Sequence, residues 1–178
     1  MLDYSSVMAA ADIVPFARNV DWHTLPAETS ELFTALDALA AQVTDEQLTF
    51  APHEPQADEE RGWTIPHIVA HLTASAEESG ALAAELARGI LVEKRSRYEV
   101  PWQEITTAQQ VRDRLRESRH ICLSYLGAWP EQPQLEVSYE PFPGAGELNA
   151  TARYLLGLIH THTHLGHLRE TLRQAQAH

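Results

Sequence analysis

Residues 63–72 of the chain, WTIPHIVAHL, begin the stretch that decides the fold. Thr64 can cap a helix, and Pro66 is tolerated in a helix's first turn. Apolar residues, mostly at spacings of three and four, carry the pattern on to about Arg88, and Gly89 stands where a glycine C-cap belongs. These apolar residues are Ile65, Ile68, Val69, Leu72, Leu82 and Leu86. The stretch therefore predicts a long amphipathic helix.

Three other segments predict further helices. In residues 27–43 the apolar residues recur every three or four positions, as in an amphipathic helix. The capping-box pattern of residues 107–110 opens a second one, which Pro130 stops. A last helix is expected from about residue 148 to residue 174, where leucines keep the same spacing.

The remaining segments are expected to connect these helices. Residues 1–25 are weakly patterned and are interpreted as a lead-in segment, and residues 45–58 as a loop. Residues 135–139 alternate over too short a length to predict a strand. Because no linker or internal repeat divides the chain, residues 1–178 are predicted to form a single domain. The fold class is all-α, an antiparallel four-helix bundle with long inter-helix loops.

Composition excludes several classes of function. Lys and Arg number 13 against 25 Asp and Glu, a net charge of −12, and no basic stripe is present. Binding to nucleic acid or to an anionic membrane is therefore not expected. The single cysteine, Cys122, forms no disulfide framework and is interpreted as a small core residue. With no signal peptide and no apolar run long enough to span a membrane, we expect a cytoplasmic protein.

Histidine is the unusual residue, since four of the ten lie between His160 and His167. At about 100° per residue, His160, His164 and His167 share an arc of about 60° on the last helix, and His162 lies opposite. His160 and His164 are one turn apart, so both imidazoles can bind one metal ion. The alternative is that they are ordinary surface or core residues.

A third ligand is expected from the helix that begins near Thr64. His67 and His71 on that helix are also four residues apart. His71 lies nearer to the edge of the apolar stripe, and His67 turns outward. This geometry favours His71 as the third ligand and leaves His67 as a solvated or supporting residue.

The segments WTIPHIVAHL and HTHTHLGHLR, at residues 63–72 and 160–169, resemble the second-helix and fourth-helix signatures of the DinB-like superfamily. That group includes metal-dependent bacillithiol and mycothiol transferases. The resemblance spans roughly residues 28–175 and departs from the usual pattern at His167, where Gln is common. It implies an antiparallel four-helix bundle, often dimeric, with one divalent metal ion. Carried over by position, the metal ligands are His71, His160 and His164.

The resemblance also implies an activity. Three neutral imidazoles leave a coordination position open, and Zn²⁺, Ni²⁺ and Fe²⁺ all suit such ligands. Better-understood members of the family activate a low-molecular-weight thiol for transfer to a small electrophile, so the expected partners are a thiol and a small-molecule substrate. The alternatives are a metal-dependent hydrolase that uses bound water, and a non-catalytic, stress-associated metal-binding protein. The family name refers to DNA damage, but the net charge argues against action on DNA.

The residues around these ligands leave several alternatives open. His167 is the candidate catalytic residue: it could orient a ligand, bind substrate or act as a general acid or base, and the alternative is a packed side chain. Glu77 and Glu78 are expected to be solvated. The side chains that could contact a substrate, or could instead pair with acids or belong to the core, are Arg153, Arg169, Tyr139 and Trp63.

Overall fold

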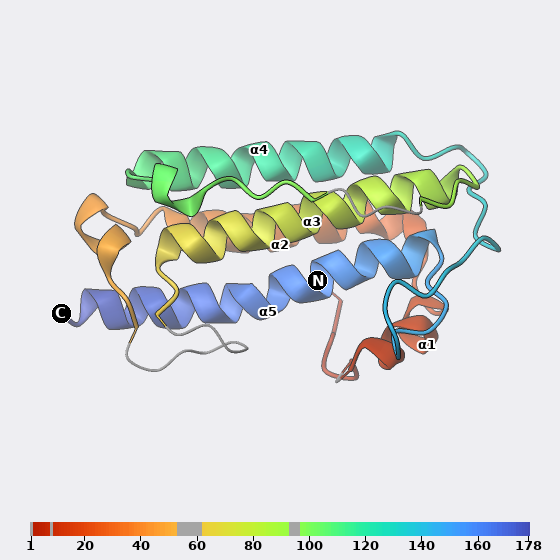
Figure 1. Ribbon diagram of the computed structural model, residues 1–178, viewed down its shortest axis with the longest axis horizontal. Helices are drawn as coiled ribbons and strands as arrows, with labels where there is room; N and C mark the ends of the chain where they lie inside the picture. The colour runs from red at the N-terminus through yellow and green to blue at the C-terminus, as the bar shows by residue number, and fades with distance from the viewer. Residues whose placement is uncertain (1, 8, 53–61, 93–96) are drawn as a thin grey trace.

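A computed structural model describes the protein at residues 2–7, 9–52, 62–92 and 97–178 (Figure 1). Within these residues the α-helices are α1 (Ile13–Ala17), α2 (Leu25–Ala40), α3 (Ile65–Ala87), α4 (Ala108–Gly127) and α5 (Ala150–Gln176). The described residues contain no strand, only an isolated antiparallel bridge between Tyr139 and Leu148. The predicted all-α class is confirmed.

The four long helices, α2 to α5, lie side by side along the length of the molecule (Figure 1). α2 and α5 run in one direction, and α3 and α4 run in the other. α3 packs against α5 and also against α4, so it has both as neighbours. Because α3 and α4 are parallel, the chain between them must return along the whole length of the helices. Consecutive helices therefore do not simply alternate in direction.

Helix ends follow the predicted signals closely. The Thr64 hydroxyl accepts a hydrogen bond from the backbone N–H of His67, and Pro66 lies in the first turn of α3. At the other end Gly89 has φ +80°, and the N–H groups of Gly89 and Ile90 bond back to the last turn, which is the Schellman arrangement. The predicted capping box of residues 107–110 is present at the start of α4.

Several short elements were not predicted, including the 3₁₀ helices Trp22–Thr24 and Trp102–Glu104. The lead-in segment contains a 3₁₀ turn, Ala10–Asp12, followed by α1, which packs against α5. The first part of the predicted loop at residues 45–58 is a 3₁₀ helix, Asp45–Thr49, and residues 53–58 lie outside the described residues. Such short elements span too few residues to show a hydrophobic period.

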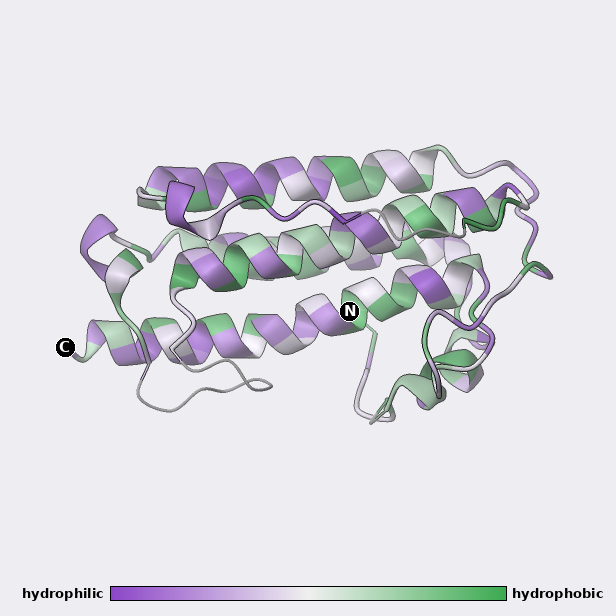
Figure 2. Ribbon diagram, in the orientation of Figure 1, coloured by the Kyte–Doolittle hydropathy of each residue, from purple (hydrophilic) through white to green (hydrophobic). Residues whose placement is uncertain are grey.

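α3 is the most enclosed of the long helices, and most of its residues are buried. The buried residues of α4, in contrast, follow one stripe, and strongly hydrophilic residues cover much of the rest (Figure 2). α5 approaches α3 very closely at Gly157, where an added Cβ would overlap the side chain of Ser79. This close contact holds the facing side chains of α3 and α5 in fixed register.

Among the described residues, every helix is too short or too polar to cross a bilayer.

Candidate metal centre

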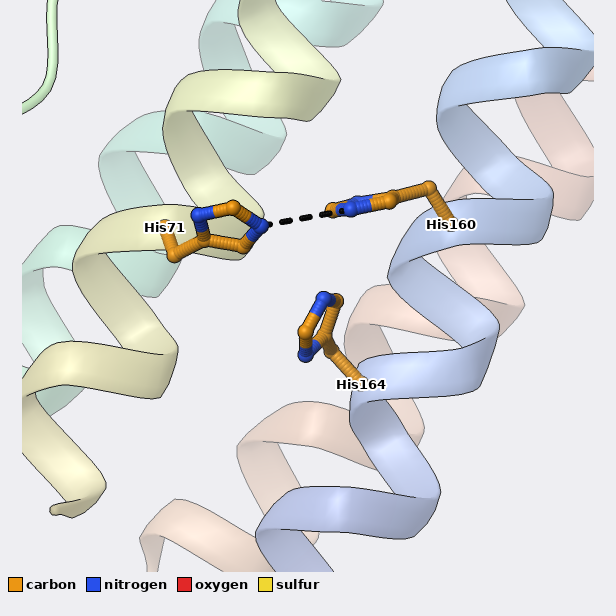
Figure 3. Close-up of side chains that lie close together, drawn as sticks. All are labelled: His71, His160 and His164. Atoms are coloured by element: carbon orange, nitrogen blue, oxygen red, sulfur yellow. Dashed lines mark hydrogen bonds between the residues drawn. The ribbon is translucent and has the colours of Figure 1, made fainter. Parts of the chain in front are cut away.

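The three predicted ligands meet between α3 and α5. His71 projects from α3, while His160 and His164 project toward it from successive turns of α5 (Figure 3). Each offers one ring nitrogen, and these atoms all lie within 4.8 Å of one another. The Nε2 atoms of His71 and His160 are 3.3 Å apart. Three imidazoles converging at this spacing could hold one metal ion.

His164 is the most deeply buried of the three. Burial, together with the neighbouring His160 and His71 rings, lowers its pKa to about 2. The side chain is therefore neutral at physiological pH, and the neutral imidazole is the form that binds a metal. Its Nδ1 atom is buried and has no hydrogen-bond partner among the described residues. A buried polar atom without a partner is costly, so the site fits an ion that would engage this ring.

An arginine and a carboxylate lie on the outer side of His71. Nη2 of Arg97 donates to Nδ1 of His71 at 3.1 Å and to the backbone carbonyl oxygen of His71 at 3.2 Å. The same Nη2 donates to Oε2 of Glu99 at 2.7 Å, and this oxygen lies 3.8 Å from Nδ1 of His71. When Nε2 of His71 binds a metal, Nδ1 carries the proton and requires an acceptor. Glu99 is positioned to become that acceptor.

Trp63 forms one wall of the centre. Its ring centroid lies 4.8 Å from that of His71 and 5.7 Å from that of His164. The ring of His67 is stacked between Trp63 and Trp102, with centroid distances of 4.3 Å and 5.3 Å. His67 therefore supports the wall from behind, whereas His71 faces α5.

The structure places His167 in a different position from the three converging rings. It is buried one turn beyond His164, with 5.8 Å between the two ring centroids, and packs near Trp63. His162 is exposed on the opposite side of α5, as the helical geometry predicts, and its ring contacts Tyr4.

A cavity of about 260 Å³ lies next to the histidines. It begins at His160 and Arg97 and extends between α3 and α5 to Glu78 and Arg153, with Tyr139 on its wall. Its volume is just under the roughly 300–1,000 Å³ of pockets for drug-sized ligands, so it suits a small molecule. His167 is not among the lining residues.

Two expectations about neighbouring residues change. Glu78 was expected to be solvated, but its side chain is 2% exposed and faces Arg153 of α5. That prediction is wrong because other helices cover α3 on more than the one face that its apolar stripe marks. Glu77 is also largely covered and pairs with Arg114 of α4. Arg169 is exposed and does not line the cavity.

Arg97 and Glu99 were missed by the sequence analysis. They lie in the connection between α3 and α4, where no helical period relates them to His71. The only sequence signal there was a short run of mixed charges, which is typical of a solvated segment.

Comparison with known proteins agrees with this geometry. The family model of the DinB superfamily matches residues 28–168, which include all three converging histidines. Searches among curated proteins and among solved structures return no match. Because the family model covers most of the chain, this protein belongs to the DinB superfamily.

Proposed function

We propose that this protein is a metal-dependent enzyme that activates a low-molecular-weight thiol for transfer to a small electrophile. The observation that carries the proposal is the convergence of His71, His160 and His164 beside a cavity of small-molecule size. When bound there, a divalent ion such as Zn²⁺, Ni²⁺ or Fe²⁺ would supply Lewis acidity that favours the thiolate form of a thiol.

The chain's own residues have distinct roles in this proposal. The three imidazoles would hold the ion in their neutral forms. Glu99, 3.8 Å from Nδ1 of His71, would then accept a hydrogen bond from Nδ1–H in place of the bond that Arg97 donates, and would orient that ring. Trp63 keeps water away from one side of the histidines. The cavity next to His160 admits the small reactants and holds them near each other.

The transfer step requires a thiol from outside the chain, because Cys122, the single cysteine, is buried in α4. The thiol releases its proton to solvent, and the sulfur attacks a carbon of the electrophile. The sulfur–carbon bond forms as the leaving group departs with the bonding electron pair.

His167 is buried beside Trp63 and does not line the cavity. This position favours a role in orienting the neighbouring His164 ring over direct contact with substrate. His167→Gln tests this role because glutamine can keep a hydrogen bond but cannot act as a base near neutral pH. If His167 orients its neighbours, the variant keeps most of its activity with an unchanged pH profile. A lost limb of the pH profile would instead support acid–base catalysis.

The finer structural predictions belong with this proposal. We infer a single-domain, DinB-type four-helix bundle made of α2 to α5, working in the cytoplasm and able to form a homodimer. The side-by-side packing of the four long helices supports the bundle.

The activity is tested with 1-chloro-2,4-dinitrobenzene as electrophile and L-cysteine as thiol. Metal-loaded wild-type protein is expected to accelerate thioether formation, while chelator-treated protein and His160→Ala do not. His162→Ala is the matched control, since His162 is exposed on the opposite side of the same helix. Release of chloride without any thiol would contradict the transferase proposal and favour metal-dependent hydrolysis. Equal rates with and without metal would contradict both.

A further inference from the structure

The least satisfied cation among the described side chains of the cavity is Arg153. Its side chain is 6% exposed, yet among the described residues it makes a single hydrogen bond, from Nη1 to Oγ of Ser79 at 2.7 Å. Its Nη2 lies 4.0 Å from Oε2 of Glu78, which is too long for a hydrogen bond. Its Nε is buried and has no hydrogen-bond partner among the described residues. A guanidinium carries five N–H donors, so most of this donor capacity is unused.

The position of this guanidinium is fixed by the packing of two helices. Ser79 sits directly against Gly157, so the hydroxyl that accepts from Arg153 lies at the level of Gly157 on α5. His160 follows three residues later, which corresponds to about 4.5 Å along the helix axis. The arginine head group is therefore about one helical turn from the histidines, at the other end of the same cavity.

The charges around the cavity favour an anionic ligand. Arg97 is paired with Glu99, and Arg153 faces Glu78, so these four side chains cancel in charge. Three neutral imidazoles would add nothing to the two positive charges of a divalent ion. A ligand with one thiolate and one carboxylate would balance the charge of that ion among the described side chains, and burial strongly favours neutral assemblies.

We propose that Arg153 binds a carboxylate on the small ligand whose sulfur reaches the three histidines. The unused Nη2 group and the second N–H of Nη1 form the planar pair of donors that a carboxylate accepts in a bidentate manner, while Nε–H, which is closed off from the cavity, reports on the same guanidinium. Apolar side chains, including Leu156, also line the cavity and suit a short hydrocarbon spacer. The claim that this carboxylate belongs to the thiol ligand rests on the function proposed above. The claim that Arg153 binds a carboxylate does not.

The carboxylate site is tested first on metal-free protein with butyrate as probe and 1-butanol as the uncharged control. The NMR signal of the Arg153 Nε–H group, assigned by its loss in Arg153→Lys, is expected to shift with butyrate and not with butanol. Arg114→Lys is the matched control because Arg114, on α4, already pairs with two carboxylates. This variant is expected to leave the butyrate response unchanged.

The link to the thiol is tested on cobalt-loaded protein through the thiolate-to-cobalt absorption band. 3-Mercaptopropionate should bind about tenfold or more tightly than 3-mercapto-1-propanol, as expected for hydrogen bonds between charged groups. The double variant Arg153→Met/Glu78→Gln removes both charges of this facing pair, and it should bind the two thiols equally.

The outcomes separate this inference from the proposed function. A shifted Nε–H signal together with a carboxylate preference supports the inference. No shift and equal affinities overturn it, even when both thiols give the cobalt band. A shifted signal without any cobalt–thiol band overturns thiol activation at the histidines and leaves the carboxylate site standing.

Discussion

Two neighbouring glutamates of α3 face different helices, and their partners differ in kind. Glu77 pairs with Arg114 of α4, which also binds Glu117 at 3.1 Å, so that arginine is held by two carboxylates. Glu78 faces Arg153 of α5 across 4.0 Å, and that arginine has one hydroxyl as its hydrogen-bond partner among the described residues. Nε lacks a partner among the described residues in both arginines, but both terminal nitrogens of Arg114 are hydrogen-bonded to carboxylates, whereas Nη2 of Arg153 is not. This difference is the basis for treating the α3–α4 contact as structural and for proposing a ligand at the α3–α5 contact.

The largest expected effect is on stability when one charge of the α3–α5 pair is removed. Arg153→Met should lower the free energy of unfolding by about 3–5 kcal/mol, because it removes the cation that faces the buried Glu78 carboxylate. Adding Glu78→Gln should restore most of the loss. Arg114→Met should cost only about 1–2 kcal/mol, since Glu77 is 19% exposed and reaches water. Urea denaturation measures all three variants, and equal losses for the two arginines would remove the distinction.

Glycines provide a second test of the two contacts. Gly157→Ala forces a Cβ into Ser79 at the α3–α5 contact and should destabilise the protein by about 1–3 kcal/mol. In Gly80→Ala the nearest atom to the new Cβ is Cδ2 of the Tyr125 ring, at 3.0 Å across the α3–α4 contact, and that ring can turn away. We therefore expect a nearly neutral effect on unfolding free energy.

A control for helix propensity lies on α5 itself. Gly166 is exposed and has no atom within 4 Å of an added Cβ, so Gly166→Ala should stabilise the protein by about 0.5–1 kcal/mol. Thermal unfolding should rank the three alanine variants by stability, with Gly166→Ala the most stable, Gly80→Ala near the wild type and Gly157→Ala the least stable. If Gly157→Ala stabilised the protein as Gly166→Ala does, the close approach of α3 and α5 would be wrong.

Glu99 and Glu117 each bind an arginine, but only the substitution of Glu99 should change the affinity for metal. Glu99→Gln removes the carboxylate that is placed to accept a hydrogen bond from Nδ1–H of metal-bound His71, and it should weaken metal binding about tenfold to a hundredfold. Glu117→Gln, on the α4 side, should leave the affinity unchanged. Competition with a chromophoric chelator measures both affinities. Equal weakening in the two variants would show a general effect of charge and would argue against an orienting role for Glu99.

The smallest effect is expected at Cys122, on the face of α4 that packs in the core. Burial raises the pKa of this thiol to about 12, with Glu77 contributing. Almost no thiolate exists near neutral pH, so iodoacetamide should leave the native protein unmodified there and should react in urea. Fast alkylation of the folded protein, followed by mass spectrometry, would contradict the burial of α4 against α3.

Periodicity was sufficient to predict the long helices and their ends. Thr64, Gly89 and the capping box at residues 107–110 act within one turn of chain, so the sequence alone predicts them. Spacing on one helix also relates His160 to His164. Such local signals carry no information about which helices become neighbours.

The features that could not be predicted depend on contacts between distant segments. Glu78 and Arg153 are 75 residues apart, and only the packing of α3 on α5 places them together. Arg97 and Glu99 reach His71 from the connection that returns between the parallel helices α3 and α4. The sequence therefore predicted the three converging histidines and missed the side chains that surround them.

The central claim, that three histidines of α3 and α5 form one metal site, is tested most directly by metal analysis. Wild-type protein and the His162→Ala control should each contain about one divalent ion per chain after purification without added metal. The triple variant His71→Ala/His160→Ala/His164→Ala should contain none while keeping its helical circular dichroism. A folded triple variant that holds as much metal as the wild type, or a wild type that holds none and binds none when metal is added, would contradict the claim.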